Sequence, residues 1–113
     1  MTNQFTQNNQ KESTVYIVNN RVPVAEGYEE MFEDRFRKRA GQIEKQPGFV
    51  SMSILKPETD DTPYVVMTVW QDKVAFEAWV GSEDFKLAHQ NPMPKESFNG
   101  AGKLEMFDVI IEA

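Results

Sequence analysis

The 113-residue chain contains no cysteine and only one histidine, His89. The absence of cysteine excludes disulfide bonds, iron–sulfur clusters and thiolate zinc sites, and it agrees with a reducing compartment such as the cytoplasm. A single histidine gives no support to metal sites built from several imidazoles. Stabilisation beyond one small hydrophobic core would therefore come most naturally from self-association.

Excess positive charge and long apolar runs are also missing. The net charge is −6, and the one dense basic run, at residues 35–39, is read as the solvated face of a helix, so no nucleic-acid partner is expected. No apolar stretch approaches the roughly 20 residues that span a bilayer, and residues 1–13 lack the apolar segment of a signal peptide. We therefore expect a cytoplasmic protein without membrane insertion.

Several catalytic motifs are absent as well. The sequence has no glycine-rich phosphate loop, no His-x-x-x-His pair and no serine in a strand-to-helix elbow, so hydrolysis and nucleotide chemistry have little support. Adjacent carboxylates occur at residues 29–30, 60–61 and 83–84. Each pair lies at a predicted helix start or in a loop, where solvation and the helix dipole account for it.

The composition separates a short polar tail from one domain. Residues 1–13 are rich in asparagine and glutamine, too polar to offset the entropy of ordering them, and are predicted to be disordered. Residues 14–113 are predicted to form a single domain. Its predicted strands are 14–24, 49–56, 64–71 and 103–112, and its predicted helices are 27–46, a second one capped by Asp72 and ended by Gly81, and 83–90 with Ser82 as its cap.

This order of elements predicts an α+β domain with the ferredoxin-like βαββαβ arrangement, in which helices cover one face of an antiparallel sheet. Val50, Met52 and Ile54 are expected to share a face of their strand. The strands 64–71 and 103–112 are apolar on both faces, whereas one helix layer covers only one face. We therefore expect the other face to pack against a second copy in a homodimer.

Three residues are candidates for chemistry, and each has a structural alternative. His89 shares a helix face with Phe85 near a helix end, where an imidazolium is favoured as a capping or surface group. One imidazole is nevertheless enough for haem, because the macrocycle already supplies four nitrogens to the iron. Trp79 could equally be the buried side of its helix. Asn19 and Asn20 lie in mid-strand, where one could face solvent or mark a bulge, and the period of two places them on opposite faces.

A longer pattern resembles the haem-degrading branch of the antibiotic biosynthesis monooxygenase superfamily, the IsdG-type haem monooxygenases. The residues that carry the resemblance are Thr68-Val69-Trp70, Lys73, Ala75-Phe76, Trp79, Ser82, Phe85-Lys86 and Ala88-His89, with Asn20-Arg21 and Gly48-Phe49 upstream. The resemblance covers about residues 14–90, and the last strand agrees only in character.

The resemblance implies a dimeric α+β barrel that holds one haem per subunit between helices and sheet. It further implies that His89 is the axial ligand of the haem iron, that Trp79 presses on the haem and bends it, and that Asn20 donates a hydrogen bond on the distal side. Haem would be both cofactor and substrate: O2 and electrons from an unidentified donor would cleave the porphyrin ring and release iron. Two alternatives stay open, a cofactor-independent monooxygenase acting on a small aromatic or quinone-like substrate, and a non-catalytic haem-binding dimer.

The sequence departs from this pattern in two respects. The loop after the histidine carries Pro92 and Pro94, which have no counterpart in the resemblance and could change access to the pocket. The negative net charge gives no general attraction for haem propionates, which leaves Arg21, Lys86 or backbone amides as local candidates to neutralise them.

Overall fold

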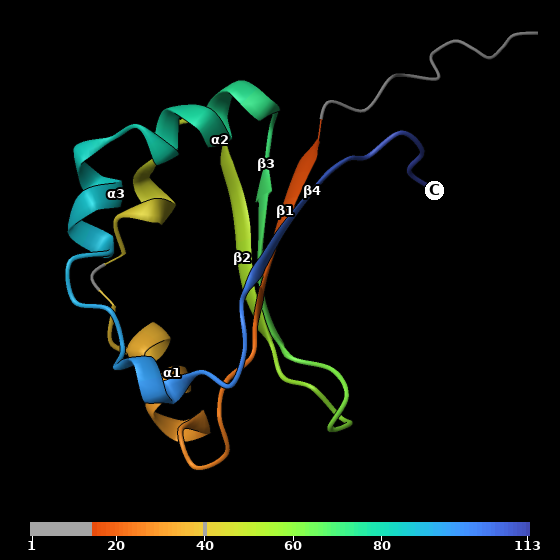
Figure 1. The fold of residues 1–113 in the computed structure, drawn as a ribbon. Coiled ribbons are helices and arrows are strands. Elements are labelled where there is room, and N and C mark those ends of the chain that lie inside the picture. Colours follow the sequence, from red (N-terminus) through yellow and green to blue (C-terminus); the bar gives the residue numbers. More distant parts are fainter. Residues whose placement is uncertain (1–14, 40) are drawn as a thin grey trace, which may run out of the picture.

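The computed structural model describes residues 15–39 and 41–113, so the tail predicted to be disordered, 1–13, lies outside the described residues, as do Thr14 and Ala40. Four antiparallel strands form one sheet in the order β2-β3-β1-β4. The helices lie together on one face of this sheet (Figure 1). The strands are β1 Tyr16–Val22, β2 Phe49–Leu55, β3 Tyr64–Trp70 and β4 Lys103–Asp108, and the α-helices are α1 Glu29–Arg37, α2 Lys73–Val80 and α3 Glu83–Ala88. The predicted ferredoxin-like α+β fold is confirmed.

The first helix is shorter than the predicted range 27–46. α1 ends at Arg37, and after Gly41 the chain forms a separate short 3-10 helix, Ile43–Lys45. Gly41 has a φ of 82°, a left-handed conformation that an α-helix does not contain. The apolar periodicity continued across this break because Ile43, only 4% exposed, is itself buried in a hydrophobic cluster with Trp70 and Trp79.

The side chains that face the helices are set by the strand register. Tyr16 of β1 lies opposite Trp70 of β3, and both rings contact Phe76 of α2, with ring centroids 6.0 Å apart in each case. Because side chains alternate along a strand, Val18 and Asn20 share this helix-facing side with Tyr16. The even-numbered residues of β1, β3 and β4 therefore face the helices, and the odd-numbered ones face the other way.

A bulge changes the predicted pattern of β2. The register with β3 shifts between Phe49 and Ser51, so that the bulge falls at Val50, whose side chain is 51% exposed. The strict alternation that predicted a shared face for Val50, Met52 and Ile54 is therefore interrupted at Val50. Phe49 lies on the helix side, where its ring packs edge-on against Trp70.

The predicted helix caps are present. Asp72 accepts a hydrogen bond from the backbone N–H of Ala75, and Ser82 accepts one from that of Phe85. α2 also lies very close to the sheet at Gly48, where an added Cβ would come within 2.5 Å of the Cβ of Ala75. Glycine at this position is what allows α2, which carries Trp79, to approach the sheet.

The opposite face of the sheet is not covered by any helix of residues 15–39 and 41–113, the part of the chain that the structure describes (Figure 1). Its apolar side chains come from β1, β3 and β4, and Phe107 among them is 49% exposed. After β4 the chain continues with Ile110 and Ile111, each about 80% exposed. In the part of the chain that the structure describes, no helix has the length and apolar character needed to cross a membrane.

Candidate functional site

His89 lies at the C-terminal end of α3 with its side chain exposed. Its Nδ1 is 2.8 Å from the carbonyl oxygen of Phe85, and its ring stacks on the Phe85 ring with 4.1 Å between centroids. Because a carbonyl oxygen can only accept, Nδ1 carries the hydrogen, and the neutral imidazole then has its lone pair on Nε2. Proteins commonly fix metal-binding histidines in this way, with one ring nitrogen donating to a carbonyl and the other facing the metal.

Trp79 is buried, with 5% of its surface exposed. Its ring stacks on Trp70 at a centroid distance of 6.5 Å and meets the Phe85 ring edge-on at 5.4 Å. The interpretation of Trp79 as the buried side of its helix is therefore correct. The same contacts place it one aromatic ring away from His89, so these two candidates belong to one cluster.

Asn20, and not Asn19, lies on the helix-facing side of β1. Its neighbours across the sheet are Val66 on β3 and Leu104 on β4, and its side chain is exposed. Asn19 faces the other side of the sheet, where its Oδ1 is buried without a hydrogen-bond partner among the residues described. Among the residues that the structure describes, no hydrogen bond joins the Asn20 side chain to Trp79 or His89, which lie on α2 and at the end of α3.

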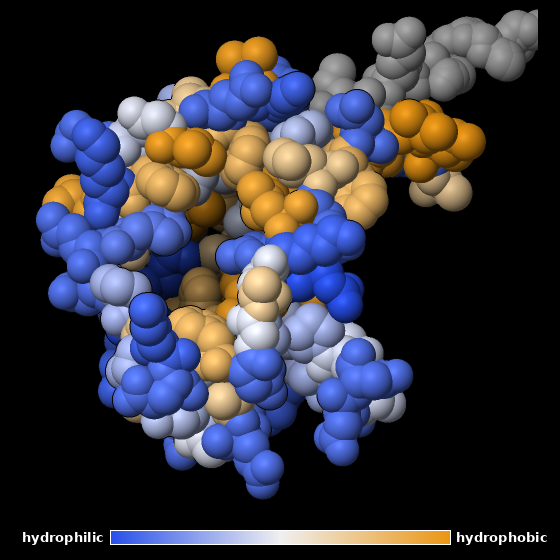
Figure 2. Space-filling view, viewed as in Figure 1, coloured by the Kyte–Doolittle hydropathy of each residue, from blue (hydrophilic) through white to orange (hydrophobic). Residues whose placement is uncertain are grey.

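A hollow is visible in the molecular surface between α3, α1 and the sheet (Figure 2). Leu104 and Met106 of β4 share the helix-facing side with Asn20, yet they are 50% and 49% exposed. The rings of α1 and α2 contact Tyr64 and Trp70 of β3 and Tyr16 of β1, and the exposure of the β4 side chains shows that the described helices leave this side of the face uncovered. The result is an apolar surface with one exposed amide, on the face of the sheet that the helices and His89 share.

The cations near the hollow differ from those suggested by the sequence. Arg21 is an odd-numbered residue of β1 and faces away from the helices, so it is wrongly placed for a ligand in the hollow. Lys86 pairs with Glu83 on the exposed side of α3. Arg35 of α1, which the sequence placed on a solvated face, instead donates to the carbonyl of Asn91, two residues after His89.

The loop that contains the two prolines is fixed against the segment between β1 and α1. The backbone N–H of Ala25 donates to the carbonyl of Ser97 at 2.7 Å, and Val24 forms a bridge with Phe98. Ser97 is fully buried. Together with the Arg35 contact, these bonds hold residues 90–102 along α1, where Figure 1 shows the chain passing from α3 toward β4.

A second concavity lies between α1 and strands β2 and β3. This pocket has a volume of about 350 Å³, and its apolar wall consists of Phe36, Met52, Ile54 and the ring of Tyr64. No pattern in the sequence predicts this pocket, because its walls come from three elements far apart in the chain.

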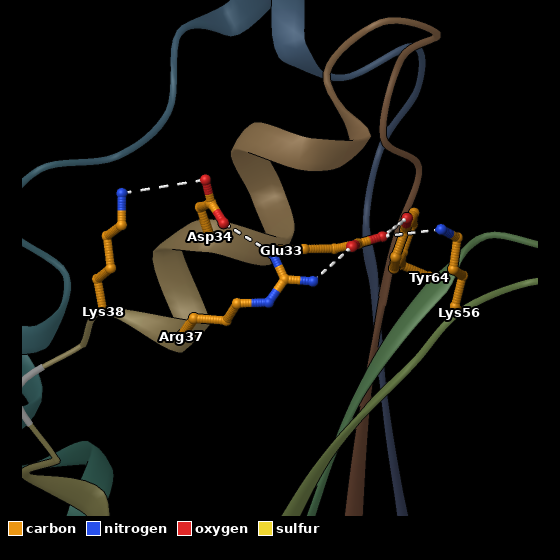
Figure 3. Close-up of polar contacts among 6 residues, drawn as sticks. All are labelled: Glu33, Asp34, Arg37, Lys38, Lys56 and Tyr64. Atoms are coloured by element: carbon orange, nitrogen blue, oxygen red, sulfur yellow. Dashed lines mark hydrogen bonds and ion pairs between the residues drawn. The ribbon is translucent and has the colours of Figure 1, made fainter.

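A polar network closes one side of this pocket (Figure 3). Glu33 accepts hydrogen bonds from the Tyr64 hydroxyl and from Arg37 at 3.0 Å, and it forms an ion pair with Lys56 at 3.2 Å. The bond from Tyr64, followed by that from Lys56, lowers the pKa of Glu33. Burial and the neighbouring Glu33 carboxylate raise the pKa of Tyr64 to about 12. At neutral pH the pocket therefore has a neutral phenol and an ionised carboxylate on this side.

Comparison with known proteins points to one family. The family model described as antibiotic biosynthesis monooxygenase matches residues 15–91. A staphylobilin-producing haem oxygenase from Staphylococcus haemolyticus is 38% identical over 79 residues, which are 68% of this chain and 75% of that protein. A mycobilin-producing haem oxygenase from Mycobacterium tuberculosis is 34% identical over 91 residues, which are 80% of this chain and 83% of that protein.

Solved structures give the same fold with two kinds of chemistry. The haem degrader MhuD from Mycobacterium tuberculosis, with two haems bound in its active site, has a TM-score of 0.72 at 28% identity and covers 87% of this chain and 98% of its own. A mutant of SnoaB, a cofactor-independent oxygenase from Streptomyces nogalater, has a TM-score of 0.65 at 25% identity and covers 85% and 93%.

Proposed function

Because the chain belongs to the antibiotic biosynthesis monooxygenase family, we propose that it is a haem-degrading oxygenase that binds haem through His89. The substrate would be the porphyrin itself, cleaved with O2 and electrons from an external donor so that iron is released. The observation that carries this proposal is the state of His89: an exposed imidazole whose Nδ1 is bonded to a backbone carbonyl and whose Nε2 is available for iron.

The residues around the hollow suit haem. A flat, largely apolar macrocycle would meet the exposed side chains of Leu104 and Met106, and the iron would meet a neutral imidazole nitrogen. When bound, haem supplies the iron at which O2 is activated and the ring that is cleaved. The protein therefore has to bind, orient and shield the haem, and it needs no second metal.

We assign each candidate residue one task. His89 would hold the haem iron from the α3 side. Trp79 would press on the macrocycle, and because its indole is packed between Trp70 and Phe85 it would yield little to a ligand that pushes against it. The side-chain amide of Asn20 would supply a hydrogen-bond donor to the bound group from the sheet side of the hollow.

Arg35 is our candidate for the haem propionates. Its guanidinium donates to a neutral carbonyl, that of Asn91, close to His89. A carboxylate is a stronger acceptor for a guanidinium than an amide carbonyl is, so a propionate in the hollow would compete well for this side chain.

We also propose that the protein is a homodimer formed by the uncovered sheet faces of two copies. This face contains Ile17, Met67 and Phe107 among its apolar side chains, and water would otherwise cover it. Sedimentation at micromolar concentration should show a dimer, and a species with the mass of a single chain throughout would contradict this part of the proposal.

Turnover is the test of the enzymatic proposal. Protein loaded with hemin should lose its haem absorption when a reductant and O2 are added together, and an iron chelator should then detect released iron. Haem that survives both reagents would instead favour a non-catalytic haem-binding dimer.

The pocket of about 350 Å³ supports a second candidate function, cofactor-independent oxygenation of a small aromatic or quinone-like substrate. Its apolar wall, with Phe36 and Met52, and its neutral Tyr64 hydroxyl suit a ligand of that size. SnoaB, which shares the fold, is a cofactor-independent oxygenase. Oxygen consumption in haem-free protein on addition of such a substrate would favour this candidate over haem degradation.

A further inference from the structure

We propose that Phe85 is a positioning residue that fixes the imidazole of His89 and couples it mechanically to Trp79. The proposal rests on the proposed function where it concerns haem, whereas its structural part concerns the unliganded protein. The backbone N–H, the backbone carbonyl and the ring of Phe85 all form contacts at this site. Its N–H donates to Ser82, its carbonyl accepts from His89, and its ring contacts both His89 and Trp79.

The contact with His89 has two components. The carbonyl of Phe85 sets which ring nitrogen carries the hydrogen, and the ring of Phe85 sets the plane of the imidazole, since the two rings are 4.1 Å apart and inclined by only 30°. A single hydrogen bond would leave an exposed side chain free to rotate about its bonds. The ring stacking removes that freedom, so that Nε2 keeps one direction.

The contact with Trp79 extends this arrangement into the core. Phe85 meets Trp79 edge-on at 5.4 Å, and Trp79 stacks on Trp70, which has no exposed surface and donates its indole N–H to Thr68 at 2.9 Å. Four aromatic rings in sequential contact therefore connect the sheet to the end of α3: those of Trp70, Trp79, Phe85 and His89 itself. Any displacement of the imidazole or of the Trp79 indole is transmitted through Phe85, because close-packed rings do not slide independently.

The coupling matters because His89 and Trp79 would act on the same macrocycle. One would hold the iron and the other would push on the ring, so their relative position decides how far the macrocycle is bent. α3 has only six residues and is separated from α2 by Gly81 and Ser82. The backbone alone is therefore a weak connection between the two side chains, and the Phe85 ring supplies the direct one.

The first test reads the His89 tautomer by ¹⁵N NMR in unliganded protein at about pH 8.5, where an ordinary imidazole is neutral. The chain has one histidine, so the signals need no assignment. Wild type should show the Nδ1–H form. Phe85→Leu should shift toward the Nε2–H form that free imidazole side chains prefer in water, and Phe85→Tyr should restore the wild-type signal.

Phe76→Leu is the matched control, because Phe76 contacts Trp70 and Tyr16 in the same core but has no ring contact with His89 in the described structure. It should leave the tautomer unchanged. Wild-type protein in the Nε2–H form, or an unchanged tautomer in folded Phe85→Leu, would overturn the proposal. If Phe85→Leu does not fold, Phe85→Met, which also removes the ring and keeps the backbone carbonyl, takes its place and should show the same shift toward Nε2–H.

The second test adds hemin. Loss of one ring-stacking contact predicts haem binding about tenfold weaker in Phe85→Leu, together with a shifted iron–histidine vibration, whereas Phe76→Leu should keep that vibration. An identical vibration in Phe85→Leu and wild type would overturn the coupling. Failure of wild type to bind hemin at all would refute the proposed function and leave the tautomer test as the measure of the role of Phe85.

Discussion

Replacing Gly48 by alanine tests how α2, and with it Trp79, is placed against the sheet. Gly48 has a φ of 82°, and an added Cβ would lie 2.5 Å from the Cβ of Ala75. A left-handed alanine costs about 1–2 kcal/mol, and overpacking of this kind costs about 1–3 kcal/mol more. We therefore expect the free energy of unfolding to fall by about 2–5 kcal/mol.

Two control variants separate the conformational cost of Gly48→Ala from its overpacking cost. Gly27 has a φ of 93° with nothing within 4 Å of an added Cβ, so Gly27→Ala should show only the conformational cost, about 1–2 kcal/mol. Ala75→Gly removes the atom with which the new Cβ would collide and by itself costs about 1 kcal/mol as a helix substitution. The double variant Gly48→Ala/Ala75→Gly should be more stable than the sum of its single variants predicts.

Equilibrium unfolding in urea, followed by tryptophan fluorescence, measures all four variants. The two tryptophans of the chain, Trp70 and Trp79, are both buried near α2, so the signal reports on this region. Equal losses in Gly48→Ala and Gly27→Ala, or strict additivity in the double variant, would refute the close packing of α2 on Gly48.

Three further predictions concern caps, pH and assembly. Ser82→Ala removes the cap of α3 and should lower the free energy of unfolding by about 1 kcal/mol in the same urea assay. The pKa of Tyr64 is raised to about 12, so its contribution to stability is complete below its ordinary value of 10.0 and is lost as the pH rises through 12. Thermal melts should therefore fall more steeply over this range in wild type than in Tyr64→Phe, and parallel curves would contradict this. Phe107→Glu puts a charge on the uncovered sheet face and should yield monomers on sedimentation, whereas a dimer as tight as wild type would place the interface elsewhere.

The order of elements could be predicted because helices and strands bury their apolar side chains with different periods. The same periodicity misplaced the end of α1. It registers only which side chains are apolar, and Ile43 continued the pattern although Gly41 had already broken the helix with a positive φ. The bulge at Val50 could not be predicted either, because one extra residue in a strand does not change the composition of the segment.

The candidate site could be predicted only in part. Pattern and family resemblance named His89, Trp79 and Asn20, but the choice between Asn19 and Asn20 needed the register of β1 with its neighbours. The role of Phe85 depends on rings from α2 and α3 meeting in space. Arg21 was suggested as a partner for haem propionates in the same pocket as Asn20. Because the two residues are adjacent in β1, their side chains lie on opposite faces of the sheet.

The contact of Arg35 with the loop after His89 could not be predicted from the sequence. In the sequence it is one of several cations on an amphipathic helix, and nothing there distinguishes it from its neighbours. Arg37 pairs with Glu33 and Asp34 on the helix itself, whereas Arg35 contacts a loop 56 residues away. Which member of a basic run is available to a ligand is decided by tertiary contacts.

The central claim is that His89 binds haem iron through Nε2, and a hemin titration followed at the Soret band tests it most directly. Wild type should give a saturable, shifted Soret band, and His89→Ala should lose it. Leu87→Ala, an exposed position on the same helix, should keep it. A wild-type spectrum indistinguishable from that of free hemin, or an unchanged band in His89→Ala, would contradict the account.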